Sequence, residues 1–372
     1  MRRKCLLELE CGDTFTGELV GAPLLASGEL VFTTGMVGYS EALTDPSFFG
    51  QILVFSFPCI GNYGVPVLPD NADKILPHGF ESEKVHVSAV VINMENTEAF
   101  HWSSVQSLHN WLVAQKVPGI VGLDTRHLVH LVRKNNGGLL AKVIPSDYEG
   151  VSAVNSSFNL DEKSFFDPSS QEIISRVSVR ERKIIGSGKV RVAIVDCGVK
   201  YNIIRRIIQS GCEVELLPWD TDFKSVDSSA WVISNGPGDP SKTGDLVSRV
   251  RGLLGTGKPV LGICLGHQLL ALAAGFNVTR MPYGHRSRNQ PVYISGTRKG
   301  YITTQNHCYV VDAKSMYGSD WDVWFINAND QTVEGIKHKT LPIRSIQFHP
   351  EAAGGPRETG WILDEFVAGV NK

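Results

Sequence analysis

Apolar and polar positions follow a regular pattern from about residue 189 to the end of the chain. Short apolar runs, typical of buried strands, alternate with stretches in which apolar residues recur every three or four positions, as in amphipathic helices. The apolar runs predict strands at 190–195, 213–217, 231–234, 260–261 and 343–348. The periodic stretches predict helices at 201–210 and 246–254, and a third from Leu265 to a stop at Gly275. Alternating strands and helices predict a parallel sheet with helices on both faces.

The first part of the chain mixes both kinds of element less regularly. Apolar runs predict strands at 29–32, 51–55 and 85–91, and a periodic stretch predicts a helix at 105–115. Residues 151–188 are rich in serine and charge and end in Gly-Ser-Gly, which is typical of a connecting segment. We therefore predict an α/β protein with a mixed domain at 1–150, a connecting segment at 151–188 and a second domain at 189–372.

Composition and charge narrow the class of protein. The 372 residues are 42% hydrophobic and 20% charged, which is ordinary for a globular protein. A formal net charge of −2 argues against nucleic acid as a partner. No apolar run approaches the roughly 20 residues that a membrane span needs. The basic start is followed at once by acidic residues, so it predicts neither a signal nor a transit peptide, and we expect a cytoplasmic protein.

The cysteines and histidines predict neither a disulfide framework nor a metal site. The 7 cysteines are odd in number and widely spaced, with no Cys-x-x-Cys. The 11 histidines include no pair at helical spacing with a glutamate. Reduced thiols and no bound metal are therefore expected.

The sequence Gly-Ile-Cys-Leu-Gly at 262–266 joins a predicted strand to a predicted helix. A nucleophile between glycines at such a turn is typical of the nucleophile elbow, here with Cys264 in place of serine. The glycines suit a turn too tight for flanking Cβ atoms, and the positive end of the helix dipole favours a thiolate. Cys264 is thus a candidate nucleophile, although this motif alone is also compatible with a buried structural cysteine.

Two further segments offer the groups that a catalytic cysteine needs. His349-Pro350-Glu351 follows the predicted strand at 343–348. Residues i and i+2 of an extended chain point the same way, so His349 can act as the base with Glu351 orienting it. In the loop at 234–240, Gly236 can bring its N–H close to a ligand, as oxyanion stabilisation requires. Taken singly, each segment is better explained as ordinary structure, with His349 as a structural or solvated loop histidine and 234–240 as a tight loop after a strand.

Together, the three segments resemble the class I (triad) glutamine amidotransferases, where they occur in the same order and at the same spacing. The N-terminal part resembles the small, glutaminase subunit of carbamoyl-phosphate synthetase, through Thr-Gly-Met-Val-Gly-Tyr at 34–39, Leu-Thr-Asp-Pro-Ser at 43–47 and Gly-Leu-Asp-Thr-Arg at 122–126. The resemblance covers essentially the whole chain and is closest to the glutaminase portion of the eukaryotic pyrimidine-pathway enzyme. It implies a class I glutamine amidotransferase domain at 189–372, with a central, mostly parallel sheet flanked by helices.

The resemblance also implies a role for each matching residue. Cys264 attacks the side-chain amide of L-glutamine, His349 transfers protons, and Glu351 orients His349. The N–H groups of Gly236 and Leu265 form the oxyanion hole. The glutamine pocket corresponds to Ser47, Gly236, Gly238, Leu265, Gln268, Asn306, Cys308 and Tyr309. Because Ser47 comes from the N-terminal domain, the resemblance implies a pocket to which both domains contribute.

A partner follows from the same resemblance. Ammonia passes to a carbamoyl-phosphate synthetase large subunit, or to a fused synthetase domain, which makes carbamoyl phosphate for pyrimidine or arginine biosynthesis. No cofactor is expected in this chain, and ATP and Mg²⁺ are expected on the synthetase. Cys308 departs from the family, which usually has glycine there, whereas the triad is intact.

Two other functions stay open from the sequence. The chain can be a non-catalytic subunit that serves assembly or regulation of the synthetase. It can also be the glutaminase of a different amidotransferase, such as one that makes guanylate or anthranilate. The block at 1–150 argues against that second alternative, because those glutaminases lack such a domain.

Overall fold

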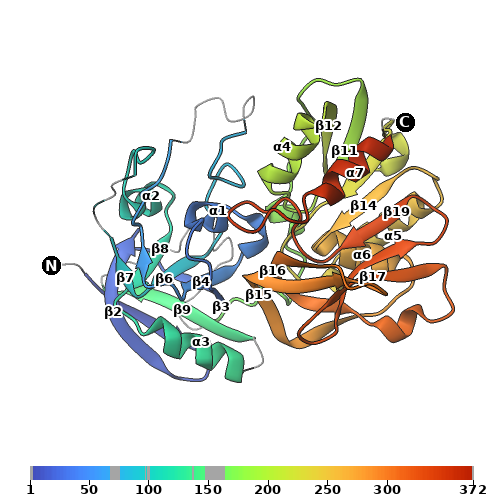
Figure 1. Ribbon diagram of the computed structural model, residues 1–372. Coiled ribbons are helices and arrows are strands. Elements are labelled where there is room, and N and C mark those ends of the chain that lie inside the picture. The colour runs from blue at the N-terminus through green and yellow to red at the C-terminus, as the bar shows by residue number, and fades with distance from the viewer. Residues whose placement is uncertain are drawn as a thin grey trace. The chain divides into compact units, whose positions relative to one another are not determined.

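The computed structural model describes residues 3–67, 76–96, 98, 101–135, 138–146 and 164–370. The chain forms two compact units (Figure 1). The first comprises Met1–Ala72 and Pro77–Ser170, and the second comprises Asp73–Leu76 and Gln171–Lys372. Part of the predicted connecting segment, 151–163, lies outside the described residues, whereas Lys183–Ile185 forms strand β10 of the second unit.

A closed barrel with strand order β1-β2-β8-β6-β4-β3-β9 forms the first unit. Its strands are β1 (Lys4–Leu9), β2 (Thr14–Gly21), β3 (Ala26–Thr33), β4 (Gln51–Phe55), β6 (Ala89–Ile92), β8 (Pro118–Val121) and β9 (Leu139–Pro145). Strand β1 pairs with both β2 and β9, which closes the barrel. The helices are α1 (Tyr39–Leu43), α2 (Leu108–Ala114) and α3 (Thr125–Lys134), and β5 (Cys59–Ile60) pairs with β7 (Met94–Glu95). The strands predicted at 29–32 and 51–55 are confirmed as parts of β3 and β4.

Two predicted elements of this unit have other bounds in the structure. The strand predicted at 85–91 was wrong in its first half, because β6 begins at Ala89. The N–H of Val85 donates to the side chain of Gln115 at 3.1 Å, and that of His86 donates to the Leu43 carbonyl at 2.9 Å, so these residues join loops and not the ladder. The helix predicted at 105–115 begins at Leu108, because the side chain of Ser107 caps its first turn.

The second unit is built on a sheet with strand order β10-β12-β11-β13-β14-β19-β18-β16-β15-β17. Its central strands run parallel to one another: β12 (Cys212–Pro218), β11 (Val190–Asp196), β13 (Ala230–Ile233), β14 (Val260–Ile263) and β19 (Ile343–Ile346). Helices α4 (Tyr201–Gln209) and α7 (Trp361–Val370) pack on one apolar core. Helices α5 (Gly244–Leu254) and α6 (Leu265–Ala273) pack on the other (Figure 1). The α/β fold, with a parallel core between helices, is confirmed.

An antiparallel extension of this sheet was not predicted. It consists of β15 (Val278–Ile294), β16 (Gly300–Val311), β17 (Trp321–Asn327) and β18 (Val333–His338). Strand β18 joins the extension to β19, so it lies beside the parallel core. Strand β16 borders Cys264, because the carbonyl oxygen of Asn306 lies 4.0 Å from its sulfur.

Among the described helices, none combines the length and the apolar character that crossing a bilayer requires. The cytoplasmic location stays a prediction.

Candidate active site

Cys264 lies at the turn between β14 and α6, at the carboxyl end of a central parallel strand. It is the N-cap of α6 and has a positive φ of 54°, which is unusual for a residue other than glycine. A Cβ atom on Gly266 would collide with the carbonyl oxygen of Ile233, so only glycine fits there. The backbone thus holds the thiol at a strained, closely packed turn, which is the geometry of a nucleophile elbow.

The imidazole of His349 and the carboxylate of Glu351 form a buried pair. His349 Nδ1 lies 2.7 Å from Glu351 Oε1, and the two side chains are 2% and 0% exposed. The same carboxylate oxygen forms an ion pair with Lys200 Nζ, at a distance of 2.8 Å. The two residues come together at a turn formed by 350–351, and not on extended chain as the i, i+2 argument expected. The backbone N–H of His349 donates to the Thr304 carbonyl of β16 at 3.0 Å, which anchors this turn.

The charges of this pair determine its protonation. Burial and the charge of Lys200 oppose the charged form of His349, but Glu351 and the sulfur of Cys264 outweigh them and raise the pKa of His349 to about 10. Burial likewise opposes ionisation of Glu351, yet Lys200 and His349 hold the pKa of its carboxyl group well below its usual range. Glu351 is therefore a carboxylate, and a proton on His349 is favoured. Nε2 of His349 has no hydrogen-bond partner among the described residues, so it is available to the thiol.

Other polar groups surround the sulfur of Cys264. Nε2 of Gln347 lies 3.7 Å from Sγ, and the carbonyl oxygen of Asn306 lies 4.0 Å from it. Nε2 of Gln268 donates to Gln347 Oε1 at 3.1 Å and lies 3.3 Å from the carbonyl oxygen of Tyr309. The structure therefore places Asn306 at the thiol, and Gln347 connects the thiol to Gln268, which in turn contacts Tyr309.

Gly236 and Leu265 lie side by side next to the nucleophile. A Cβ built on Gly236 would be 3.0 Å from Leu265 Cδ2 and would collide with the carbonyl oxygen of Cys197. Within the described residues, the N–H groups of Gly236 and Leu265 donate no hydrogen bond to another protein group. Two free donors beside a thiol can stabilise an oxyanion.

The remaining predicted pocket residues have different surroundings. Gly238 has a positive φ of 91° in the loop after β13. Cys308 is partly exposed on β16, and Arg286 Nη2 lies 2.6 Å from its sulfur. Ser47 belongs to the first unit, where it is buried and its N–H donates to Asp45 Oδ1 at 2.9 Å. Its part in the pocket stays a prediction.

Sequence reasoning missed Lys200, Gln347 and Arg286. Lys200 stands just before α4 and far along the chain from Glu351, so no local pattern connects the two. Gln347 lies two residues before His349, and that spacing at the end of β19 was a signal that could have been used. Residues able to hold a metal ion lie on the antiparallel extension: the ligand atoms of His285, His307 and Glu334 are all within 4.8 Å of one another.

Comparison with known proteins adds family information to this geometry. Residues 193–368 match the family model of glutamine amidotransferase class-I. Residues 7–143 match the model of the carbamoyl-phosphate synthase small chain, CPSase domain.

Three relatives illustrate the range of proteins that resemble this chain. The carbamoyl phosphate synthase arginine-specific small chain of Schizosaccharomyces pombe is 39% identical over 97% of this chain and 86% of its own length. The multifunctional protein CAD of Squalus acanthias is 43% identical over 97% of this chain. The mitochondrial carbamoyl-phosphate synthase [ammonia] of Aquarana catesbeiana is 39% identical over 98% of this chain. This chain spans only 16% of the length of the CAD relative and 24% of that of the ammonia relative.

Proposed function

Because this chain belongs to the carbamoyl-phosphate synthase small-chain family, we propose that it is the glutaminase component of a glutamine-dependent carbamoyl-phosphate synthase. One observation carries the proposal: Cys264 lies at a strained strand-to-helix turn beside a buried His349–Glu351 pair whose free nitrogen can serve the thiol. Such an arrangement generates a nucleophile from a cysteine at neutral pH.

The reaction begins with transfer of the thiol proton of Cys264 to Nε2 of His349. The raised pKa of His349 favours this transfer, and Glu351 stabilises the imidazolium through Nδ1. The thiolate then attacks the side-chain carbonyl carbon of L-glutamine, and the electron pair of the C=O bond moves to oxygen. The N–H groups of Gly236 and Leu265 are positioned to stabilise that oxyanion.

Collapse of the tetrahedral species completes the first half of the reaction. The C–N bond breaks, and His349 gives its proton to the leaving nitrogen, which departs as ammonia. A γ-glutamyl thioester on Cys264 remains. Water activated by His349 then attacks the thioester, which releases glutamate and restores the thiol.

Glutamine recognition rests on the groups around the thiol. Asn306 presents its carbonyl oxygen to the thiol, Gln268 contacts Tyr309, and Gly236 and Leu265 lie side by side next to Cys264. The resemblance adds Gly238 to the proposed pocket. The resemblance also assigns Ser47 and Cys308 to glutamine binding. A cysteine in place of the family's usual glycine adds bulk and a thiol to this pocket, with Arg286 beside it.

The proposed partner is a carbamoyl-phosphate synthetase large subunit or a synthetase domain fused to this one. The relative named CAD is multifunctional, and the relative from S. pombe is a small chain, which supports either arrangement. The synthetase would receive the ammonia and would carry the ATP and Mg²⁺ sites.

Glutamate release from glutamine tests the assignment directly. Cys264→Ala should lower the rate of hydrolysis by at least about 10³-fold, because the nucleophile is lost. Cys212→Ala is the matched control, since Cys212 is a buried cysteine of β12 in the core of the same unit. With a synthetase added, the Cys264 variant should still support carbamoyl phosphate synthesis from ammonia. Glutaminase activity that survives in this variant would refute the proposal.

A regulatory subunit without activity is the alternative, and the relative named for ammonia makes it worth testing. A thiol-reactive glutamine analogue distinguishes the two functions. A glutaminase should be labelled at Cys264 at a rate that added glutamine slows. If Cys264 is never labelled, with or without a synthetase, the regulatory function is supported instead.

A further inference from the structure

Four buried polar side chains meet on the antiparallel extension of the second unit. They are His285 of β15, Gln305 and His307 of β16, and Glu334 of β18. Gln305 Oε1 lies 2.8 Å from His285 Nδ1 and 3.0 Å from His307 Nε2. Glu334 Oε1 lies 3.1 Å and 4.0 Å from the same two nitrogens. Four potential ligand atoms therefore surround one point between three strands.

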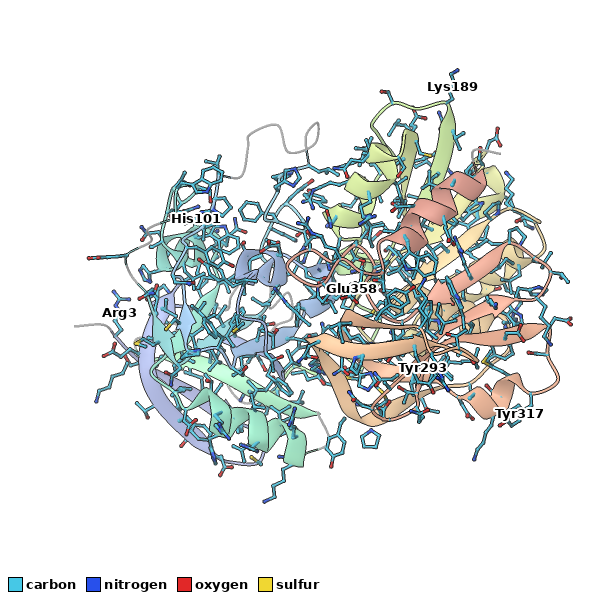
Figure 2. All side chains as sticks on the ribbon, viewed as in Figure 1. Arg3, His101, Lys189, Tyr293, Tyr317 and Glu358 are labelled. Carbon is cyan, nitrogen blue, oxygen red and sulfur yellow. The ribbon has the colours of Figure 1, made fainter. Side chains whose placement is uncertain are left out.

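The outer nitrogen of each imidazole faces an acceptor. Nε2 of His285 lies 2.8 Å from Asp330 Oδ2, and Nδ1 of His307 lies 2.9 Å from the backbone oxygen of Tyr309. Histidines that bind metals characteristically donate their far N–H to a carboxylate or a backbone carbonyl, which turns the lone pair of the near nitrogen toward the metal. Asp330 is itself held in place, because the hydroxyl of Tyr293 in β15, a residue labelled in Figure 2, donates to Gln331 Oε1 of the same loop at 2.7 Å.

When both imidazoles are neutral and donate from their outer nitrogens, the inner atoms of the group are all acceptors. The hydrogen bonds favour this orientation of the Gln305 amide, because its Nε2 donates to Thr303 Oγ1 at 3.1 Å and that hydroxyl donates to a backbone carbonyl. Buried polar atoms are nearly always paired, so converging lone pairs need either added protons or a cation. A proton on each inner nitrogen would charge both imidazoles, whose ring centroids are only 4.9 Å apart.

The side-chain amide of Asn327 supplies one of the hydrogen-bond donors that these acceptor atoms need. Nδ2 of Asn327 donates to Glu334 Oε1 at 3.0 Å and lies 3.4 Å from His285 Nδ1. The second carboxylate oxygen, Glu334 Oε2, is buried and has no hydrogen-bond partner among the described residues. An unpaired carboxylate oxygen beside two oriented imidazoles is an independent sign of a cation site.

We propose that His285, His307, Glu334 and Gln305 bind a divalent cation of the zinc type. Zinc bonds of about 2.0–2.1 Å to nitrogen and oxygen place tetrahedral ligands about 3.3 Å apart. The distances from the side-chain oxygens of Gln305 and Glu334 to the two inner histidine nitrogens are 2.8, 3.0, 3.1 and 4.0 Å, so three are slightly shorter and one is longer than this ligand spacing. Two imidazoles with a carboxylate favour zinc over calcium or magnesium. Four protein ligands make the site closed, so its role is structural.

The cation would hold β16 in place behind the nucleophile. Side chains alternate along a strand, so Gln305 and His307 face the cluster, whereas Asn306 between them presents its carbonyl oxygen to Cys264 Sγ at 4.0 Å. Glu334 is coupled to the same region, because its carbonyl accepts a hydrogen bond from the N–H of Gln347 at 2.8 Å. Loss of the cation should therefore loosen the glutamine pocket and leave the chemistry of the thiol intact.

The sequence predicted no metal here because the ligands are spread over 285–334 on strands that were not predicted. The proposal goes beyond the glutaminase function, and its test does not depend on activity.

Metal content of the full chain, purified without a histidine tag, is the direct measurement. The Cys264→Ala variant is used as the background, so that the catalytic thiol cannot bind the metal. One equivalent of zinc should remain after dialysis against a weak chelator, and Co²⁺ in its place should give the visible absorption of a tetrahedral site.

His307→Gln and Glu334→Gln should lose the metal, and Asp330→Asn should weaken its affinity about 10–100-fold. His130→Gln, at an exposed histidine of α3, is the control.

Either of two results would overturn the proposal. If the folded chain binds no zinc even when zinc is added, the cluster is a hydrogen-bond network that holds protons only. If His307→Gln and Glu334→Gln keep as much metal as His130→Gln, the ion binds elsewhere on the chain. Circular dichroism shows whether each variant is folded, and Asp330→Asn keeps the test decisive if His307→Gln fails to fold.

Discussion

One carboxylate oxygen, Oε1 of Glu351, accepts contacts from both His349 Nδ1 and Lys200 Nζ. The imidazole contact fixes the tautomer, because Nδ1 must carry the proton and Nε2 is left for the thiol. The lysine keeps the carboxylate ionised although it is buried, since Lys200 helps to hold the pKa of Glu351 well below its usual range. His349, Glu351 and Lys200 therefore act together, because the ammonium group of Lys200 keeps Glu351 in the ionised form that orients His349.

The sequence motifs identified the residues of the reaction but not those that support them. Cys264, His349 and Glu351 stand in short segments with a recognisable order. Lys200 has no such signal, because its partner is 151 positions further along the chain, and only the fold brings the two together. The supporting residues of a site are therefore the part that sequence reasoning leaves out.

Because the backbone is closely packed at the nucleophile elbow, adding one methyl group at Gly266 should greatly reduce stability. Gly266→Ala should destabilise the second unit by about 3 kcal/mol, because the new Cβ collides with the rigid carbonyl of Ile233. Gly252→Ala in α5 is the control, since a Cβ there meets no atom within 4 Å and should stabilise the helix by about 0.5–1 kcal/mol. Urea unfolding measures both. A Gly266 variant as stable as the original protein would contradict this account of the elbow.

The central strands and helices of the second unit follow directly from the sequence pattern. Predicted helices at 201–210 and 246–254 correspond to Tyr201–Gln209 and Gly244–Leu254, because buried helices and parallel strands carry strong apolar periodicity. Strands β15 and β16 could not be predicted in the same way. Register shifts between Arg280 and His285, and between Ser287 and Gln290, interrupt the period of two on which a strand prediction rests.

A buried ion pair links the start of α4 to the turn after β19. Lys200→Met should destabilise the protein by about 3–5 kcal/mol, because it leaves the buried carboxylate of Glu351 without its cation. It should also slow glutamine hydrolysis, since the imidazole of His349 loses a fixed acceptor. Arg191→Met is the control, because Arg191 pairs with Glu213 at 2.8 Å but is 46% exposed, and such pairs contribute only about 0–1 kcal/mol.

Chemical denaturation at neutral pH compares these two variants. Equal losses of unfolding free energy would mean that the buried pair contributes no more than a surface pair. A Lys200 variant that is destabilised but hydrolyses glutamine at the original rate would separate the structural role of Lys200 from any role in catalysis.

Each compact unit has apolar cores of its own, and each also contains a fully buried histidine that burial keeps neutral. Burial lowers the pKa of His86, in the first unit, to about 3, and lowers that of His267, in the second unit, to about 3 as well. Domains with separate cores can unfold in separate steps. We therefore expect two unfolding transitions, each with its own dependence on pH.

The direction of the effect at His86 follows from proton binding. Between its ordinary pKa of 6.5 and about 3, the unfolded chain binds a proton at His86 that the folded unit excludes, so the folded unit loses stability as the pH falls. The loss approaches about 1.4 kcal/mol per pH unit for one such proton. His86→Leu removes this group and should flatten the pH dependence of the first unit's transition, without changing that of the second. Calorimetry between pH 4 and 7 measures both transitions, and a variant that alters both slopes equally would show that the two units unfold as one.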